Sequence, residues 1–392
     1  MINVNPTIPL SAPDITEAEI AAITAVLRTP HLSFGPELAA FESALADFHS
    51  VPHAVAVSSG TAGLQMALLT LGIGAGDEVI IPSFTFIAVA NAVVLVGATP
   101  VFADVDPISL NLTPASVERA LTSRTRAILA VHTFGIPADM IGLRRVATDH
   151  NLALIEDASE AIGAELGGRR VGSFGDLAVF GFYPNKQITT GEGGAVLAHT
   201  QPHADRLYAL RNQGRGPSMR TKTAKPPAVA HSASSGKDWL HHPDIGFNYR
   251  LSDIACALGR VQLSRIDEIL SLRRAAAELY HSLLDGVPCL ELPPIALPGC
   301  TVSWFVYVVR LSEFINRPRV QASLAELGIA SATYFSPIHQ QPAWRDLVPD
   351  LANLATTEFI GSRTLALPFF TRITSGQQQQ VASALRGALT AQ

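Results

Sequence analysis

The sequence predicts an α/β fold with a large, mostly parallel sheet domain and a smaller C-terminal α+β domain. Its 392 residues exceed the usual size of one hydrophobic core, which favours two domains. The first two-thirds of the chain alternates short, uniformly apolar runs with helical patterns, which is typical of parallel strands covered by helices on both faces. The last third alternates proline-rich turns, helices and a strand instead.

Each predicted strand of the large domain is a short apolar run, and a helical pattern separates most neighbouring runs. The stretch 84–103 is uncharged and long enough to span a membrane, but Asn91, Gly97 and Pro100 interrupt it. We therefore expect a buried helix, a turn at Gly97 and a strand there. The expected strands are 54–57, 78–81, 99–102, 127–131, 153–155, 177–182 and 195–198, and the expected helices are 61–71, 87–96, 114–121 and 141–150.

The pattern breaks at residues 215–243, where prolines and serines without periodicity predict a long loop. The expected boundaries are 10–250 for the large domain, which includes this loop, and 251–392 for the small domain. The small domain is predicted to contain a strand at 305–310 and helices at 251–270, 273–284, 320–327 and 376–389.

Composition excludes several classes of protein. The net charge of −5 argues against general nucleic-acid binding. The first residues contain neither the basic segment nor the apolar segment of a signal peptide. The three cysteines are widely spaced and form no CxxC pair, which suggests reduced thiols in a cytoplasmic protein. We expect no metal site, no nucleic-acid partner and no membrane association.

Lys186 is the residue best placed for chemistry. Only four of the 28 basic residues are lysines, and Lys222, Lys225 and Lys237 lie together in the predicted loop. An amine that must lose its proton and attack a carbonyl carbon cannot be replaced by arginine, which stays protonated. Lys186 follows a predicted strand and precedes a glycine-rich turn, so we interpret it as a candidate Schiff-base lysine. The alternative is a lysine that extends from a strand end into solvent.

Three further motifs follow predicted strands, at the edge where parallel sheets carry their sites. Residues 58–63 open a helix and can bind an anion, or form an ordinary helix cap. Asp157 can hold a cationic ring nitrogen, or cap a helix. An aromatic side chain within 82–86 can stack on a flat cofactor, or belong to the core. Together with Lys186, these groups match what pyridoxal phosphate requires.

On these residues the chain resembles the DegT/DnrJ/StrS-like sugar aminotransferases, which have the aspartate-aminotransferase-like fold type I. The resemblance extends from Pro9 to the last helix. It implies pyridoxal phosphate as the cofactor and a homodimer with shared active sites. The segments that carry the resemblance are 59–62, 82–86, 156–158, 186–194 and 246–253.

The resemblance implies a role for each residue of the cofactor site. Lys186 would form the Schiff base with the cofactor and later move a proton. Asp157 would pair with the ring nitrogen, and Phe86 would stack on the ring. Gly60 and Thr61 would bind the phosphate.

Other residues are implied on the substrate side and between subunits. Asn248 of one subunit would reach the phosphate of its neighbour's cofactor. Tyr183, Arg250 and His339 would lie toward the substrate, although a simple turn residue is the alternative interpretation of His339. A cationic cluster in the predicted loop could clamp a diphosphate or lie solvated, and its members are Arg215, Arg220, Lys222 and Lys225.

Two positions depart from the family pattern. Many members carry serine five residues before the lysine, where its hydroxyl contacts the phosphate, but this chain carries Gly181. Another donor must therefore take that place. The position often held by glutamine near the 3-hydroxyl group of the cofactor is Glu160, and a carboxylate there can alter the pKa of the Schiff base.

The expected function is transfer of an amino group from L-glutamate to a nucleotide-diphosphate-linked keto-deoxy sugar at the 4-keto position, for deoxyamino-sugar biosynthesis. One alternative is a keto-cyclitol aminotransferase, which needs no diphosphate clamp. A sugar 3-dehydratase of the same family fits less well, because such relatives carry histidine in place of the lysine. A pyridoxal-phosphate-binding regulator without turnover is the third alternative.

Overall fold

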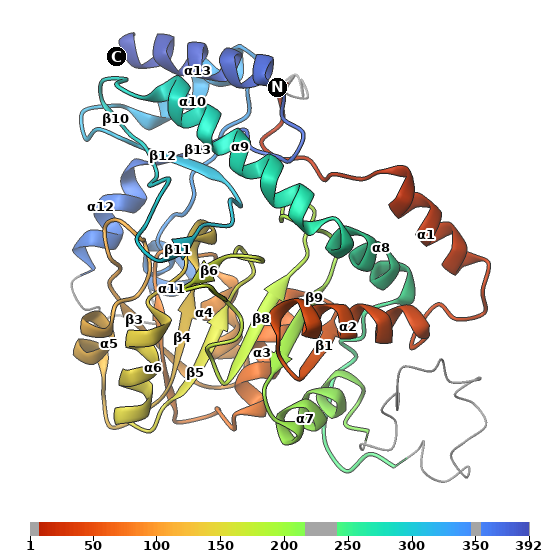
Figure 1. Cartoon of the computed structure of the whole chain (residues 1–392). Helices are drawn as coiled ribbons and strands as arrows, with labels where there is room; N and C mark the ends of the chain where they lie inside the picture. Colours follow the sequence, from red (N-terminus) through yellow and green to blue (C-terminus); the bar gives the residue numbers. More distant parts are fainter. Residues whose placement is uncertain (1–7, 216–240, 346–353, 392) are drawn as a thin grey trace.

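A seven-stranded sheet forms the centre of the computed structural model, which describes residues 8–215, 241–345 and 354–391 (Figure 1). The strand order is β1-β9-β8-β5-β4-β2-β3. Only β9 runs antiparallel to its neighbours, so the other strands share one direction. The strands are β1 (His53–Val57), β2 (Glu78–Pro82), β3 (Thr99–Ala103), β4 (Thr125–Val131), β5 (Ala153–Asp157), β8 (Leu177–Gly181) and β9 (Gly194–Ala198).

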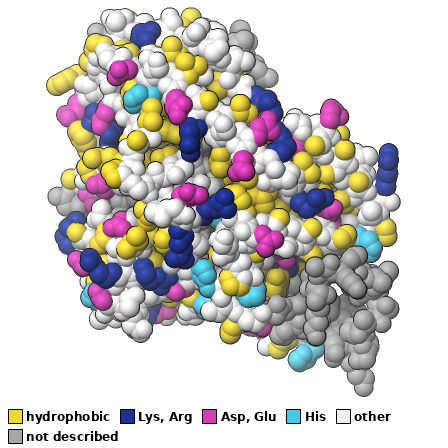
Figure 2. Space-filling view, viewed as in Figure 1, with side chains coloured by type: hydrophobic (Ala, Val, Ile, Leu, Met, Phe, Trp, Pro, Cys, Tyr) yellow, Lys and Arg dark blue, Asp and Glu magenta, His cyan; other side chains and the backbone are white. Residues whose placement is uncertain are grey.

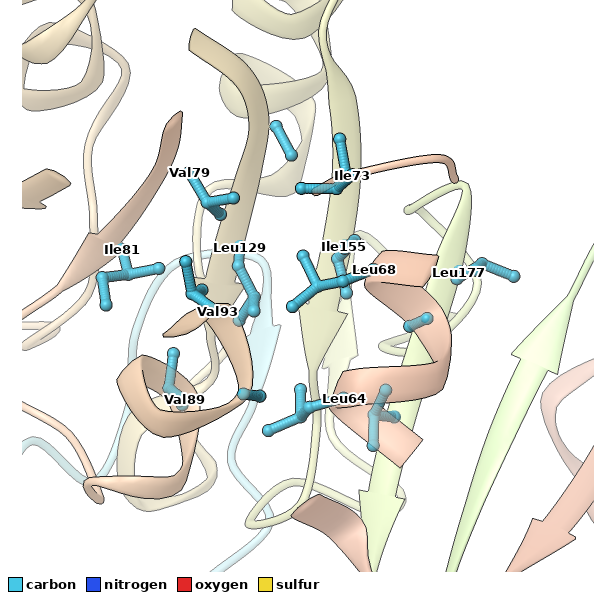
Figure 3. Packing of buried hydrophobic residues seen from close by; sticks show 14 of the residues in the cluster. Leu64, Leu68, Ile73, Val79, Ile81, Val89, Val93, Leu129, Ile155 and Leu177 are labelled. Carbon is cyan, nitrogen blue, oxygen red and sulfur yellow. The ribbon is translucent and has the colours of Figure 1, made fainter. Parts of the chain in front are cut away.

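Helices cover both faces of this sheet because nearly every strand residue is apolar and buried. One face packs against α3 (Gly60–Thr70), α4 (Ala88–Leu95) and α7 (Gln201–Arg211). Figure 3 shows Leu64 and Leu68 of α3 directed toward the strands that carry Leu129 and Ile155. The other face packs against α2 (Pro36–His49), α5 (Pro114–Ala120), α6 (Met140–Asp149) and α8 (Asp253–Ser264).

The C-terminal part is a smaller α+β unit with its own core, and both ends of the described chain lie on its side of the molecule (Figure 1). Its three-stranded sheet has the order β10-β12-β13. A second small sheet, β11-β6-β7, joins the two parts of the chain. These elements are β6 (Glu165–Leu166), β7 (Arg169–Arg170), β10 (Leu290–Glu291), β11 (Cys300–Thr301), β12 (Tyr307–Leu311), β13 (Thr364–Leu367), α9 (Ile266–Leu284), α10 (Arg317–Glu326), α11 (Pro342–Arg345), α12 (Ala355–Arg363) and α13 (Ser375–Thr390).

The predicted strands and helices of the large sheet are confirmed within a few residues at each end. The predicted helices 251–270 and 273–284 are divided at the wrong place, because α8 ends at Ser264 and α9 begins at Ile266. Arg265 forms this junction. Its guanidinium nitrogens form ion pairs with carboxylate oxygens of Asp14 and Glu19, each at 2.7 Å. The helical pattern continues across Arg265 without glycine or proline, so the sequence carries no local sign of the break.

Several predictions concern regions that the structure describes in part. Residues 216–240 of the predicted loop lie outside the described residues, and so do Arg220, Lys222 and Lys225. The boundary at 250 and 251 stays a prediction. Stretch 84–103 contains α4, Gly97 with a φ of 84°, and β3, as expected, although Leu95 on α4 is 61% exposed.

Among the described residues, no helix is both long and apolar enough to cross a membrane. On the face shown in Figure 2, basic and acidic side chains are interspersed rather than gathered by sign. The three cysteines carry free thiols, and Cys256 is buried.

Candidate active site

A cavity of about 460 Å³ lies at the carboxyl ends of the parallel strands. Its lining begins with the residues that follow β1 and β2 and continues with the ends of β4, β5 and β8. A segment of the C-terminal part, Thr333 to Phe335, contributes a further wall. The predicted site residues that line this cavity are Gly60, Thr61, Phe86, Asp157, Glu160, Tyr183 and Lys186.

Lys186 is placed by the connection between the antiparallel strands β8 and β9. Its backbone N–H donates to the carbonyl oxygen of Tyr183 at 2.9 Å, which forms a tight turn directly after β8. The side chain is only 15% exposed, and Nζ lies 3.5 Å from Oε1 of Glu160 and 4.0 Å from the ring centroid of Phe305. Lys186 is therefore directed into the cavity, and the alternative of a lysine extending into solvent is wrong.

Glu160 is the carboxylate beside this amine. Its Oε2 accepts a hydrogen bond from the backbone N–H of Phe134 at 2.9 Å, and its carbonyl oxygen accepts one from the Gln187 amide at 2.6 Å. Burial raises the pKa of the Glu160 carboxyl, and the positive charge of Lys186 offsets only part of this effect. The pair can therefore hold or exchange one proton between Nζ and Oε1.

Asp157 is the last residue of β5, the strand that pairs directly with β4. The sequence placed it just beyond the strand, but the strand includes it. Its Oδ1 accepts a hydrogen bond from the backbone N–H of Ser159 at 3.0 Å. No helix begins within residues 158–164, so the alternative of an N-terminal helix cap is wrong. The carboxylate is 8% exposed and faces the same cavity as Lys186.

The start of α3 forms another wall of the cavity. Ser59 is the N-cap of this helix, and its hydroxyl oxygen accepts a hydrogen bond from the N–H of Ala62 at 3.1 Å. Gly60 and Thr61 occupy the first turn, where backbone N–H groups have no partner within the helix. The segment is therefore both a helix cap and a place where an anion can bind.

The aromatic residues divide between the core and the cavity. Phe84 is fully buried in a core cluster, whereas Phe86 is 59% exposed and lines the cavity, as predicted for a stacking ring. A further aromatic wall, which was not predicted from the sequence, is formed by Phe305, Tyr334 and Phe335. Phe86 and Phe335 have ring centroids 6.5 Å apart.

Tyr334 extends this aromatic wall with a polar end, and it was also not predicted. Burial raises the pKa of its phenol, the negative charge of Glu160 raises it further, and a hydrogen bond with Asn185 opposes both. Only Asn185 had a sequence signal, because it precedes Lys186 directly. Ser159, in the turn after Asp157, also lines the cavity and could have been found from that spacing.

Four predicted site residues do not line the cavity. Asn248 is exposed and pairs with Asn212, whose side-chain oxygen accepts a hydrogen bond from Arg250 at 3.1 Å. Burial lowers the pKa of Arg250, and the positive charges of Arg215 and Arg211 lower it further. Arg211, Arg215 and Arg250 thus lie near one another. They are beside the carboxyl end of β1, since Arg250 pairs with Val57.

His339 is the fourth of these residues. It is 5% exposed, and Nδ1 lies 2.7 Å from the hydroxyl of Ser83. Nε2 lies 3.1 Å from Oε1 of Glu358. Both ring nitrogens therefore contact protein groups, and His339 connects the end of β2 to α12. Its contact with substrate stays a prediction.

No group of three or more histidine, cysteine, aspartate or glutamate side chains with the arrangement of a metal site occurs in the described parts of the chain. The groups that line the cavity include an amine, three carboxylates, aromatic rings and the start of α3.

Comparison with known proteins connects this cavity to a family. Residues 13–386 match the profile of the DegT/DnrJ/EryC1/StrS aminotransferase family. The chain is 39% identical to GDP-perosamine synthase of Caulobacter vibrioides over 384 residues, which cover 97% of this chain and 98% of that protein.

Solved structures lead to the same family. The crystal structure of DesV from S. venezuelae is 36% identical, with a TM-score of 0.85 over 97% of this chain and 98% of that chain. Spr1654 from Streptococcus pneumoniae, described as a putative sugar aminotransferase, is 25% identical, with coverage of 98% and 100% and a TM-score of 0.88 for its PMP-form. Its PLP-form has also been solved. The chain with this cavity thus belongs to the DegT/DnrJ/EryC1/StrS aminotransferase family, whose members depend on pyridoxal phosphate.

Proposed function

We propose that the protein transfers an amino group from L-glutamate to the 4-keto group of a nucleotide-diphosphate-linked deoxy sugar. The observation that carries this proposal is the cavity in which the Lys186 amine contacts Glu160 and shares a wall with Asp157. The relation to GDP-perosamine synthase, which extends over nearly the whole of both chains, supports a sugar nucleotide as the acceptor. The keto-cyclitol and regulator alternatives are not favoured by the relatives found.

The residues of the cavity fit pyridoxal phosphate. The carboxylate of Asp157 is suited to a protonated ring nitrogen, and the exposed ring of Phe86 is suited to stacking. The first turn of α3, with Gly60 and Thr61, offers N–H groups to the phosphate. Lys186 supplies the amine that attaches the cofactor. When bound, pyridoxal phosphate supplies an electron sink for the substrate carbon that loses a proton.

Lys186 is the residue that moves protons in this proposal. Its Nζ would hold and move the proton that the substrate carbon loses. Glu160 lies 3.5 Å away and can hold the proton while the amine is neutral. Phe305 lies beneath Nζ, and together with Tyr334 and Phe335 it excludes water from this side.

The sugar nucleotide is proposed to approach from the open side of the cavity. Tyr183 lines that side and is 53% exposed, which leaves its ring available to the substrate. Arg215 and Arg250 lie outside the cavity lining but close enough for their charges to interact, and a diphosphate that extends beyond the cavity would neutralise both. His339 is proposed to act through Ser83, since that hydroxyl lies beside its ring.

We also propose that the active enzyme is a cytoplasmic homodimer in which each subunit completes its partner's site. Asn248 is exposed and lies outside the cavity of its own subunit, which leaves it available to a neighbouring one. Ile245, three residues earlier, is 86% exposed, and a subunit interface would bury it.

The test is the absorption spectrum of the protein with pyridoxal phosphate, before and after L-glutamate is added. We expect a visible band that glutamate converts to the spectrum of pyridoxamine phosphate, and a keto sugar nucleotide should reverse the change. Lys186→Ala should lose both the band and turnover. A band that glutamate leaves unchanged would overturn the choice of donor, and substantial turnover by Lys186→Ala would overturn the role of the lysine.

A further inference from the structure

We propose that the hydroxyl of Ser159 donates a hydrogen bond to the phosphate of the cofactor, in place of the side chain that Gly181 lacks. This inference rests on the proposed function, because it assigns one more contact to the same bound group. It concerns a residue that no part of the function above has used.

Ser159 lies at a narrow gap between two glycines. A β-carbon built on Gly60 would lie 3.3 Å from the Cα of Gly181 and 3.4 Å from the Oγ of Ser159. A β-carbon built on Gly181 would lie 3.4 Å from both Cβ and Oγ of Ser159. The start of α3, the end of β8 and the Ser159 hydroxyl therefore meet at one point, and all three line the cavity.

Two other hydroxyls in this wall, those of Ser59 and Thr61, belong to the start of α3 itself. Ser59 uses its oxygen to cap α3 through the N–H of Ala62. This contact stabilises the first turn whose N–H groups are offered to the phosphate. Ser159 shares the same wall without being part of the helix, so its hydroxyl can turn toward an anion there.

The position of Ser159 is fixed by its backbone. Its N–H donates to Oδ1 of Asp157 at 3.0 Å, which closes a short turn directly after β5. One turn thus holds the carboxylate assigned to the ring nitrogen and the hydroxyl assigned to the phosphate. A hydroxyl that donates to a phosphate oxygen makes a charge-assisted hydrogen bond, which is stronger than a neutral one.

The experiment measures dissociation constants of pyridoxal phosphate and of pyridoxal, which has the same ring without the phosphate, for apo-protein variants. Ser159→Ala should weaken binding of pyridoxal phosphate about tenfold and leave pyridoxal binding unchanged. Adding Gly181→Ser to that variant should restore most of the loss, since the new hydroxyl enters the same gap. Ser264→Ala is the matched control, because its hydroxyl donates to the Val261 carbonyl on an exposed part of α8.

Equal binding of pyridoxal phosphate by wild type and Ser159→Ala would overturn the inference. An equal loss for both ligands would also overturn it, because the hydroxyl would then act on the ring or on the fold. Borohydride reduction, which fixes the bound ring to Lys186, separates this test from that of the proposed function. A wild-type protein that acquires no ring at Lys186 would overturn both proposals.

Discussion

Glu160 is the residue with the clearest conflict between burial and charge. Its carboxylate lies next to the reactive amine, yet burial favours the neutral acid and raises its pKa. A buried carboxyl that has a raised pKa and contacts an amine is suited to proton exchange.

Replacing Glu160 by glutamine tests this role through pH. As the pH falls through the raised pKa of Glu160, the carboxylate becomes protonated and can no longer accept the proton of Lys186. The wild-type glutamate half-reaction should therefore slow on the acid side at a pH above the ordinary carboxyl value of about 4.3. In Glu160→Gln this acid limb should disappear, and the plateau rate should drop by at least about tenfold. Single-turnover spectra from pH 5 to 9 measure the acid limb and the plateau rate. If Glu160→Gln keeps the acid limb unchanged, the limb belongs to another titrating group.

The sequence predicted the residues whose roles depend on their place beside a strand end. Lys186 and Asp157 lie within a few residues of the end of an apolar run, so their position at one edge of the sheet was predictable. Phe305 and Tyr334 were not predictable, because they reach the cavity only when the C-terminal part packs against the large sheet. Nothing in their local sequence distinguishes them from core aromatics.

Helix α3 connects the sheet to the wall of the cavity that we propose binds the phosphate, and Gly63 sets the distance of this helix from the strands. A β-carbon at Gly63 would lie 2.8 Å from Cγ1 of Val179 and 3.3 Å from Cγ2 of Val196. Gly63→Ala should therefore push the helix outward, lower the free energy of unfolding by about 1–3 kcal/mol and weaken pyridoxal phosphate binding. Denaturant unfolding and cofactor titration measure the two effects.

Gly74 provides the comparison for this variant. The nearest atom to a β-carbon built on Gly74 would be the Val96 carbonyl oxygen, at 3.7 Å, so an added methyl group has room. Gly74→Ala should change neither stability nor cofactor binding appreciably. If Gly63→Ala also leaves stability and cofactor binding unchanged, close packing at Gly63 does not set the position of α3.

The junction between α8 and α9 depends on a buried ion pair between Arg265 and Glu19 of α1 (Glu17–Leu27). Burial alone would raise the pKa of Glu19, but hydrogen bonds from Thr16, Arg265 and Gln262 hold it at about 2. A carboxyl with a lowered pKa stabilises the fold above its unfolded value of 4.5, and this contribution is lost as the pH falls toward about 2.

Glu19→Gln should therefore lower the free energy of unfolding at pH 7 by about 2 kcal/mol. The difference from wild type should shrink between pH 4.5 and about 2, where the wild-type carboxyl also loses its charge. Urea unfolding at several pH values measures it. Glu17→Gln, on the exposed side of the same helix, should show no such pH-dependent difference; a constant gap for Glu19→Gln would mean that charge is not what stabilises the junction.

The buried strands of the large sheet were easier to predict than the helices and short strands around it. The strands of the large sheet are short apolar runs, and all were found from the sequence. The elements that were not predicted are helices α1, α2, α7, α11 and α12, strand β13, and the two-residue strands β6, β7, β10 and β11. Such short strands exist only through pairing with distant segments, as β11 does with β6, and local sequence carries little information about that pairing.

At the scale of the whole molecule, the proposed sharing of sites between subunits can be tested by mixing two inactive variants. Lys186→Ala removes the reactive amine, whereas Asn248→Ala removes a group proposed to act in the partner's site. A hybrid dimer would contain one site with both residues intact. Equal mixing, after subunit exchange, should therefore restore about a quarter of wild-type activity, since half of the dimers are hybrid and half of their sites are complete. Activity no greater than the sum of the separate variants would contradict shared sites.

The cavity also bears on when the protein becomes able to function during its synthesis. Its lining runs along the chain from Ser59 to Phe335. When Lys186 has left the ribosome, the wall that contains Phe305 and Tyr334 has not yet been made. Domains near the N-terminus generally fold first. The turn that contains Lys186 can therefore form before the C-terminal residues complete the cavity. We therefore expect the cofactor to bind only after the C-terminal part has been made, and a prematurely terminated product would carry the Lys186 amine without the complete cavity.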